Sequence, residues 1–409
     1  MDKMLKTLVL LALSYTAALS QSIETVIQKG HELTVLTVAN SPDSNLVATG
    51  SRDKSAKLWE LSTGREVRSF LGHEGSINCI DFTSDGKLMI TSSGDQTAKI
   101  WEVATGKEIF TTPKAFKLLT AAKFSPDDKY FVIGGYPDEA EVWDLQSKTV
   151  IKTIKVNADQ GLGYGINFNF STDGKWLAIG EDNRTANVYD ANTWELKYTF
   201  NQKEGWCGGC ATWVDFSSDN QRLLVASNKM VLKLYDLRSG ELIRTFGEEM
   251  EDIVSTGFSH DDQQVMVITK ENITLWDTRT GQQLTKVKPI EGAEINEGTF
   301  SKTGKTILLA CNNNEVYEWN LSTSKIQQTL TGLLNQRDKG GITYDPNFYW
   351  EQYIAKYIRF KNDLILSHDG KELIKGKFGT KVKRWDIASG KTTMEYSGHE
   401  KAALCYDLS

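Results

Sequence analysis

Two side chains with the potential for metal or redox chemistry are Cys207 and Cys210, in the segment Trp-Cys-Gly-Gly-Cys. One Cys-x-x-Cys pair supplies only two of the four ligands of a structural zinc site. A redox pair normally opens a helix, whereas this pair lies between two predicted strands. Because the chain has five cysteines, at least one is unpaired within it. We expect a local disulfide or two inert thiols here, with zinc and redox catalysis as weaker alternatives.

Other candidates for catalysis do not combine into a site. The five histidines are spread along the chain, and the acid pairs 127–128 and 261–262 occupy predicted turns, where carboxylates are solvated. Alternating glycines at 161–165 are followed by a predicted strand, whereas a phosphate-binding loop needs a following helix. We therefore predict a chain that is not an enzyme and needs neither a cofactor nor a metal.

The elements that would position any site come from an internal repeat. An aromatic residue followed by an acid or amide recurs at steps of 42, 42, 46, 46, 41, 43 and 66 residues. A period of 40–45 residues is typical of a β-propeller, in which a four-stranded unit is repeated around an axis. The pairs are Trp59-Glu60, Trp101-Glu102, Trp143-Asp144, Tyr189-Asp190, Tyr235-Asp236, Trp276-Asp277, Trp319-Asn320 and Trp385-Asp386.

A second marker gives the same count of eight units. Each unit is expected to contain strands a to d, which in the first unit span 34–39, 46–49, 55–61 and 65–70. A serine or threonine opens the turn between strands a and b. These residues are Ser41, Thr83, Ser125, Ser171, Ser217, Ser259, Ser301 and Ser367.

Eight units allow two arrangements. We prefer one eight-bladed ring over residues 22–390, in which 22–29 supplies strand d of the blade formed by 364–387. That closure removes the exposed strand edges of an open ring. Residues 391–409 would then begin a further, incomplete repeat of a longer protein. The alternative is a seven-bladed ring that ends near Leu330, with the eighth unit starting a second propeller.

The first two units carry a further set of polar residues with fixed spacing. These are His31, Ser51, Asp53 and Trp59, and then His73, Ser93, Asp95 and Trp101. A neutral imidazole can join a carboxylate to a hydroxyl, and a buried indole N–H needs an acceptor.

With the recurring Gly-His and Trp-Asp pairs, this pattern resembles the WD40-repeat family over nearly the whole chain after Gln21. The resemblance implies that each set of four forms a hydrogen-bonded tetrad within one blade. Units three to seven lack the Gly-His pair, so we expect apolar packing alone to hold those blades. The resemblance is closest to exported bacterial WD40 proteins, some of which continue into a caspase-like peptidase domain.

The N-terminus has the order of a secretory signal peptide. Lys3 and Lys6 precede the apolar run 5–13, and Ala18-Leu19-Ser20 has the small-x-small form of a cleavage site. We therefore expect residues 1–20 to be removed and the protein to be exported, periplasmic or secreted. No membrane span is expected after that removal. The net charge of -6 argues against a nucleic-acid partner.

Long connections between strand d and the next strand a indicate where a partner could bind. They cover 156–165, 201–210 and the insertion 333–359, and all such connections emerge on one face of a propeller. Aromatic side chains there favour protein or glycan contacts. The candidate binding residues are Tyr164, Trp206, Tyr344, Phe348, Tyr349, Trp350 and Tyr353.

The sequence thus predicts a non-catalytic, exported scaffold that binds a protein or peptide on this face. Two other functions remain open: the regulatory part of a larger enzyme such as a caspase-like peptidase, and a carbohydrate-binding propeller. The remaining cysteines, Cys79, Cys311 and Cys405, lie in apolar stretches and are expected to be small buried hydrophobes.

Overall fold

The computed structural model describes most of the repeat region. The described residues are 30–114, 116–136, 139–155, 166–181, 185–201, 212–227, 230–250, 252–330, 364–366, 372–376, 381–386 and 392–397. The chain divides into two compact units, Met1–Asn335 and Gln336–Ser409.

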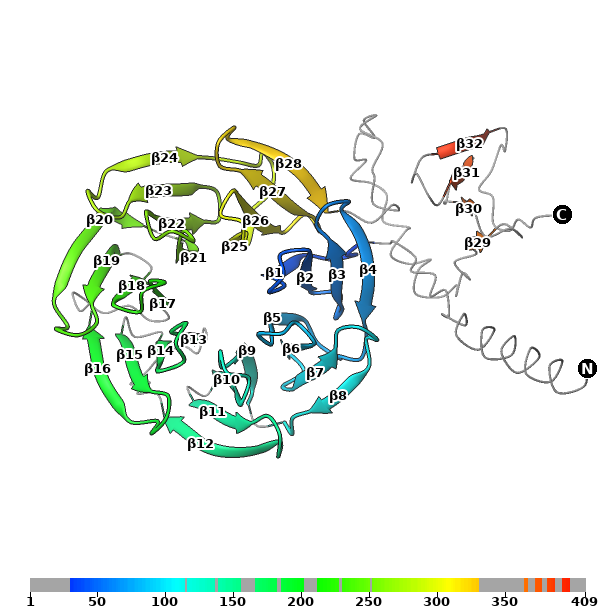
Figure 1. Ribbon diagram of the computed structural model, residues 1–409. Coiled ribbons are helices and arrows are strands. Elements are labelled where there is room, and N and C mark those ends of the chain that lie inside the picture. The colour runs from blue at the N-terminus through cyan, green and yellow to red at the C-terminus, as the bar shows by residue number, and fades with distance from the viewer. Residues whose placement is uncertain are drawn as a thin grey trace, which may run out of the picture. The chain divides into compact units, whose positions relative to one another are not determined.

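Seven four-stranded antiparallel sheets form the first unit and surround a central axis as blades (Figure 1). Blades 1 to 3 contain β1 (Val35–Asn40), β2 (Leu46–Ser51), β3 (Ala56–Glu60), β4 (Arg65–Phe70), β5 (Ile77–Phe82), β6 (Leu88–Ser93), β7 (Ala98–Glu102), β8 (Glu108–Thr111), β9 (Leu118–Phe124), β10 (Tyr130–Tyr136), β11 (Glu139–Asp144) and β12 (Thr149–Lys155).

Blades 4 to 7 continue in the same order. They contain β13 (Asn167–Phe170), β14 (Trp176–Gly180), β15 (Thr185–Asp190), β16 (Leu196–Asn201), β17 (Thr212–Phe216), β18 (Arg222–Ser227), β19 (Met230–Asp236), β20 (Leu242–Met250), β21 (Ile253–Phe258), β22 (Gln264–Thr269), β23 (Ile273–Asp277), β24 (Gln283–Val287), β25 (Ile295–Phe300), β26 (Thr306–Cys311), β27 (Val316–Asn320) and β28 (Lys325–Leu330). The all-β propeller and its four strands per blade are therefore confirmed.

The ring closes between blade 7 and blade 1. The Asn296 side chain donates to the Val35 carbonyl (2.7 Å), and the Val38 amide donates to Glu297 Oε2 (2.9 Å). Apolar residues of both blades, including Trp59 and Leu308, share one core cluster. The eight-bladed ring that we preferred is therefore wrong, and the seven-bladed alternative is what the structure has. Because every blade takes its four strands from one continuous segment, no strand from the N-terminus is needed.

The second unit contains one four-stranded sheet, in which the strands lie side by side in sequence order. It consists of β29 (Leu364–Leu366), β30 (Glu372–Gly376), β31 (Lys381–Asp386) and β32 (Thr392–Ser397). Since β32 pairs with β31, residues 392–397 supply the fourth strand of the eighth unit. The prediction that 22–29 would take this place is wrong for the same reason.

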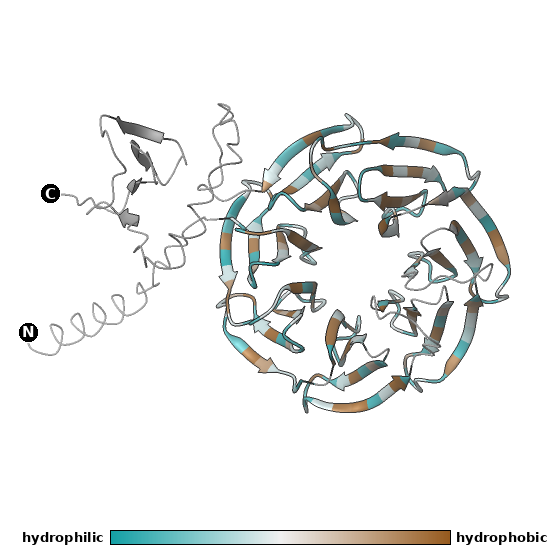
Figure 2. Ribbon diagram, turned by 180° about the vertical axis from the view of Figure 1, so that it is seen from behind, coloured by the Kyte–Doolittle hydropathy of each residue, from teal (hydrophilic) through white to brown (hydrophobic). Residues whose placement is uncertain are grey.

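Apolar side chains fill the wedges between neighbouring blades. One cluster, for example, joins Leu58 and Phe70 of blade 1 to Ile77, Met89 and Trp101 of blade 2. Figure 2 shows hydrophobic residues along the inner strands, while hydrophobic and hydrophilic residues alternate along the outer ones. Burial by both neighbours explains why the b strands, such as Leu46–Ser51 and Thr306–Cys311, are almost entirely buried.

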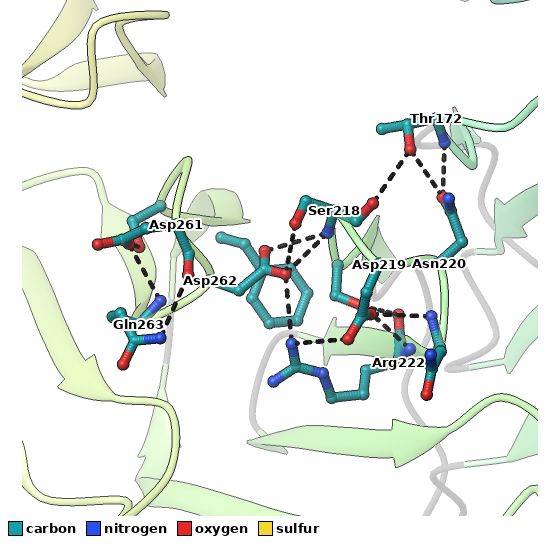
Figure 3. A network of polar contacts seen from close by, with 12 residues as sticks. Thr172, Ser218, Asp219, Asn220, Arg222, Asp261, Asp262 and Gln263 are labelled. Atoms are coloured by element: carbon teal, nitrogen blue, oxygen red, sulfur yellow. Dashed lines mark hydrogen bonds and ion pairs between the residues drawn. The ribbon is translucent and has the colours of Figure 1, made fainter.

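Polar contacts also join the a–b turns of neighbouring blades. Asp262 in blade 6 accepts hydrogen bonds from the backbone amide (2.9 Å) and hydroxyl (2.8 Å) of Ser218 in blade 5. Asn220 in blade 5 accepts equivalent bonds from Thr172 in blade 4, and Arg222 pairs with Asp262 at 3.2 Å (Figure 3). These contacts hold successive turns at a fixed spacing.

The two residues at such a junction vary together around the ring. Asp128, Asn220 and Asp262 have positive φ angles of 56–57° and face Ser84, Thr172 and Ser218 of the preceding blade. Where the preceding residue is instead Pro42, Pro126 or His260, the facing residue is Gly86, Gly174 or Gly304. A proline has neither an N–H nor a hydroxyl to donate, so a carboxylate opposite Pro42 or Pro126 would have no partner. This reason does not extend to Gly304, which faces His260. Glycine adopts the same positive φ without strain.

Candidate functional site

The tetrad of blade 1 contains three of the four residues expected from the sequence. His31 Nδ1 lies 2.8 Å from Asp53 Oδ2, and His31 Nε2 lies 2.6 Å from the hydroxyl of Thr49. That hydroxyl also accepts the indole N–H of Trp59 at 2.8 Å. Thr49 therefore takes the position that we assigned to Ser51.

The pleat of β2 explains the correction. Thr49 and Ser51 lie on the same face of the strand because side chains alternate with a period of two. Val47 is the cross-strand partner of Trp59, so Thr49 is nearer to the indole than Ser51 is. Ser51 lies at the end of β2, where its hydroxyl donates to the Leu33 carbonyl and accepts from the Asp53 amide. It shapes the b–c turn.

Blade 2 repeats this arrangement. Thr91 joins His73 Nε2 (2.8 Å) to the Trp101 indole (2.9 Å), while Ser93 accepts the Asp95 amide in the turn. Burial lowers the pKa of His73, and the proton on Nδ1 of the neutral ring can donate to Asp95. Although burial raises the pKa of Asp95, hydrogen bonds from Thr97, the amide of residue 74 and His73 outweigh it and lower the value to about 2. The tetrad of blade 2 is therefore structural, with a neutral histidine beside an ionised aspartate.

Blades without the Gly-His pair are not held by apolar packing alone, which corrects our expectation. In blade 3, the Trp143 indole donates to Glu141 Oε2 at 3.0 Å. In blade 4, Asn187 joins Glu181 to Thr199. Each of these networks is built on the residue two positions before the recurring aromatic, which faces the same side of its strand.

The inner strands enclose an axial cavity of about 650 Å³. Its lining includes the residue two positions before each turn hydroxyl, so this position forms one layer around the axis. The layer consists of Ala39, Asp81, Lys123, Asn169, Asp215, Gly257 and Thr299. Sequence reasoning missed these residues, although alignment of the seven units on the turn hydroxyl would have placed them together.

Carboxylates in the cavity bind the backbone of the next blade. Asp81 Oδ2 accepts the Phe124 amide (2.8 Å), and Asp215 Oδ2 accepts the Phe258 amide (3.0 Å). The Asn169 side chain donates to the second oxygen of Asp215 at 2.6 Å. The inner strands of neighbouring blades belong to separate sheets and share no backbone hydrogen bonds of a sheet. These side-chain-to-backbone bonds therefore connect one inner strand to the next.

The charged inner-strand side chains that line the cavity are half-buried. Burial raises the pKa of Asp81 and Glu297, and it raises the pKa of Asp215 to about 6. The carboxylate of Asp81 raises the pKa of Lys123, whose ammonium lies 3.9 Å from Asp81 Oδ1. Thus Lys123 is the charged partner that keeps Asp81 from being an isolated anion.

Little of the described cavity is arranged for bond-making chemistry. Burial raises the pKa of the Cys79 thiol to about 12, and this thiol donates to the Ala122 carbonyl. Within the described residues, no three His, Cys, Asp or Glu side chains are placed to hold a metal ion. Cys311 is buried, as expected, and Cys79 is half-buried.

The other predicted site residues lie outside the described part of the chain. These are Tyr164, Trp206, Cys207, Cys210, Tyr344, Phe348, Tyr349, Trp350 and Tyr353. Cys405 lies outside it as well. The disulfide and the aromatic binding surface therefore stay predictions.

The ring, its tetrads and its Trp-acid repeats define a WD40-type β-propeller. A family model described as the IFT122 first β-propeller matches residues 12–272, more than half of the chain. The chain therefore belongs to this family.

A curated relative is Autophagy-related protein 16 of Arabidopsis thaliana, which is 26% identical over 157 residues. The match covers 34% of this chain and 30% of the relative's length. In the described part of the chain, no helix has the length and apolar character needed to cross a bilayer.

A first prediction separates the two hydroxyls of blade 1. Thr49→Val removes the hydroxyl that accepts the buried Trp59 indole N–H and bonds His31 Nε2, which should lower the free energy of unfolding by about 2–4 kcal/mol. Ser51→Ala removes only turn bonds at a strand end and should cost about 1 kcal/mol. Urea unfolding of both variants measures this difference. A larger loss for Ser51→Ala would contradict the assignment of Thr49.

A second prediction concerns pH. The pKa of Asp215 is about 6 in the fold and near 3.8 when exposed, so folding takes up a proton between these values. Its contribution should therefore be lost as pH rises from about 4 to about 6, by at most roughly 3 kcal/mol. Asp215→Asn keeps an acceptor for the Phe258 amide and removes the titration.

The measurement is the difference in unfolding free energy between wild type and Asp215→Asn from pH 4 to pH 8. That difference cancels the other carboxylates, several of which have lowered pKa values and act in the opposite sense. A difference that does not change with pH would show that Asp215 does not titrate in this range.

Proposed function

We propose that the chain is a non-catalytic, exported scaffold that binds a protein or peptide on the face formed by its d–a connections and b–c turns. WD40-type propellers generally serve as protein-interaction scaffolds. The observation that carries the choice of face is the group of exposed leucines there, Leu33, Leu71 and Leu118. Exposed apolar side chains on a rigid surface are typical of docking sites.

The geometry of the blades supports this proposal. Strand d ends and the next strand a begins on the same side of every blade, so the segments 156–165 and 202–211 start and finish there. Interblade hydrogen bonds fix the relative positions of those strand ends. Such a scaffold holds variable loops at constant spacing, which favours binding over catalysis. No observation on the described residues favours the peptidase or carbohydrate alternatives.

A third prediction tests the face. Gly292, between β24 and β25, and Gly240, in the turn between β19 and β20, lie on opposite faces, and both are open to solvent. A biotin-acceptor peptide inserted at either site should be tolerated. Streptavidin bound at 292 should then block cross-linking to native partners, whereas streptavidin bound at 240 should not. Equal capture in both forms, measured by mass spectrometry, would rule out this face.

A fourth prediction tests export. If residues 1–20 are a signal peptide, the mature protein should begin near Gln21 and be found outside the cytoplasm. N-terminal mass spectrometry after cell fractionation measures both. The family match begins at residue 12, inside the proposed signal peptide. The experiment therefore decides whether residues 12–20 are kept in the mature protein. An intact N-terminus in the cytoplasmic fraction would refute export and leave the scaffold proposal standing.

A further inference from the structure

The junction between blades 7 and 1 differs from the other six because no segment of the chain runs directly from one blade to the other (Figure 1). Elsewhere, strand d leads straight into strand a of the next blade, as from β4, which ends at Phe70, to β5, which begins at Ile77. Such a connection keeps two separated blades close, so they meet again quickly. Blades 7 and 1 lack this tether, and we call their junction the seam.

The apolar cluster at the seam is the smallest of the seven. In the described part of the chain it contains eight buried residues, whereas the clusters at the other six junctions contain ten to twelve. Trp59 is its one aromatic residue, and the others are Val, Leu and Ala. Because stabilisation by apolar side chains grows with the area buried, the seam gains less from packing than the other junctions do.

A buried carboxylate also replaces an aliphatic side chain at the seam. In six units, the residue before the recurring aromatic packs against the next blade. These residues are Leu58, Ile100, Val142, Val188, Leu234 and Leu275.

In blade 7 the equivalent residue is Glu318. It is 5% exposed, and it lies opposite Leu308, a member of the seam cluster, on the neighbouring strand. Its Oε1 accepts the Thr306 hydroxyl at 2.8 Å, and among the described residues no cation pairs with it. A buried carboxylate without a cation is unfavourable, so Glu318 weakens the contact between the two blades.

Hydrogen bonds hold the seam shut. Near the axis, Asn296, Glu297 and Asn40 each bond the backbone of the facing blade. On the d–a face, residues 312–314 of blade 7 and residues 32–34 of blade 1 share two more bonds, of 3.1 and 3.4 Å. Such bonds contribute little net stability where water can replace them. They fix how the blades meet, but they do not make up for the smaller apolar cluster.

We propose that the ring opens and closes at the seam while the other six junctions stay shut. Opening separates the smallest apolar cluster, hydrates Glu318, and gives blades 1 and 7 a freedom of movement that tethered blades do not gain. Because residues 32–34 and 312–314 lie on the d–a face, opening changes the spacing of the connections that would contact a partner. This consequence rests on the proposed scaffold function, whereas the opening itself does not.

The first measurement compares thiol labelling of Leu308→Cys and Leu224→Cys in native buffer. Both leucines are 0% exposed and occupy the third position of strand b, in blades 7 and 5. Leu308 belongs to the seam cluster and Leu224 to the cluster between blades 5 and 6. Leu308→Cys should react with a maleimide at least tenfold faster, as read by tandem mass spectrometry. Native Cys311, which packs between blades 6 and 7, is an internal control that should react slowly.

Glu318→Leu tests the cause of the opening. It supplies the residue that blades 1, 5 and 6 carry at this position, and Thr306 keeps its hydroxyl bond to Ser301. The change should slow the labelling of Leu308→Cys severalfold and leave that of Leu224→Cys unaltered. An equal effect at both sites would mean that Glu318 acts on the whole ring, which contradicts the proposal.

Hydrogen exchange provides a test on the unmodified chain, which holds even if a cysteine variant does not fold. The amides of Val38, Phe124 and Phe258 each donate to a carboxylate of the preceding blade, at 2.9, 2.8 and 3.0 Å. After correction for intrinsic rates, the Val38 amide at the seam should exchange at least tenfold faster than the other two. Equal exchange of the three amides, or equal labelling at 308 and 224, would overturn the proposal. Neither readout depends on the streptavidin experiment, so either proposal can fail alone.

Discussion

The structure depends on how neighbouring inner strands are joined. Each blade is a separate sheet, so the strands around the axis have no shared backbone ladder. Instead, side chains of one blade bind the backbone of the next: Asp81 to Phe124, Asp215 to Phe258, and Ser255 to Gly298. At the closure, Glu297 of blade 7 binds Val38 of blade 1 in the same manner. The apolar side chains packed between blades supply most of the stabilisation, and these hydrogen bonds fix the position of each blade relative to the next.

This arrangement accounts for the charged residues at the axis. A carboxylate that accepts backbone amides can be kept at the half-buried wall of this cavity, although burial raises its pKa. Ionisable groups around a hollow axis would suggest catalysis, and they can be recognised in the sequence only when the seven units are aligned with one another. Their oxygens are instead taken up by neighbouring blades, and Lys123 is paired with Asp81. The cavity is thus part of the scaffold, and the binding surface is sought on the face above it.

Much of the fold could be predicted because the repeat is regular. Two independent markers placed eight repeat units, seven of which form the ring, and in the first unit the predicted strands agree with β1 to β4 to within two residues. The closure could not be predicted, because a period gives the number of units and not which of them pack on each other. Thr49 was missed because two hydroxyls of β2 face the same side, and only cross-strand register distinguishes them. The axial layer is visible only after the units are superimposed.

The matched residues at the a–b turns have an evolutionary consequence. Repeats of one length could in principle be duplicated or exchanged by recombination, but each blade here carries a junction residue that fits only one of two kinds of neighbour. Placing blade 5 after blade 1 would set Asn220 against Pro42, which has no N–H to offer it, and placing blade 4 after blade 2 would set Gly174 against Ser84. Shuffled rings would thus lose junction contacts even with every blade intact. The a–b turns therefore restrict which blades can follow one another in the ring.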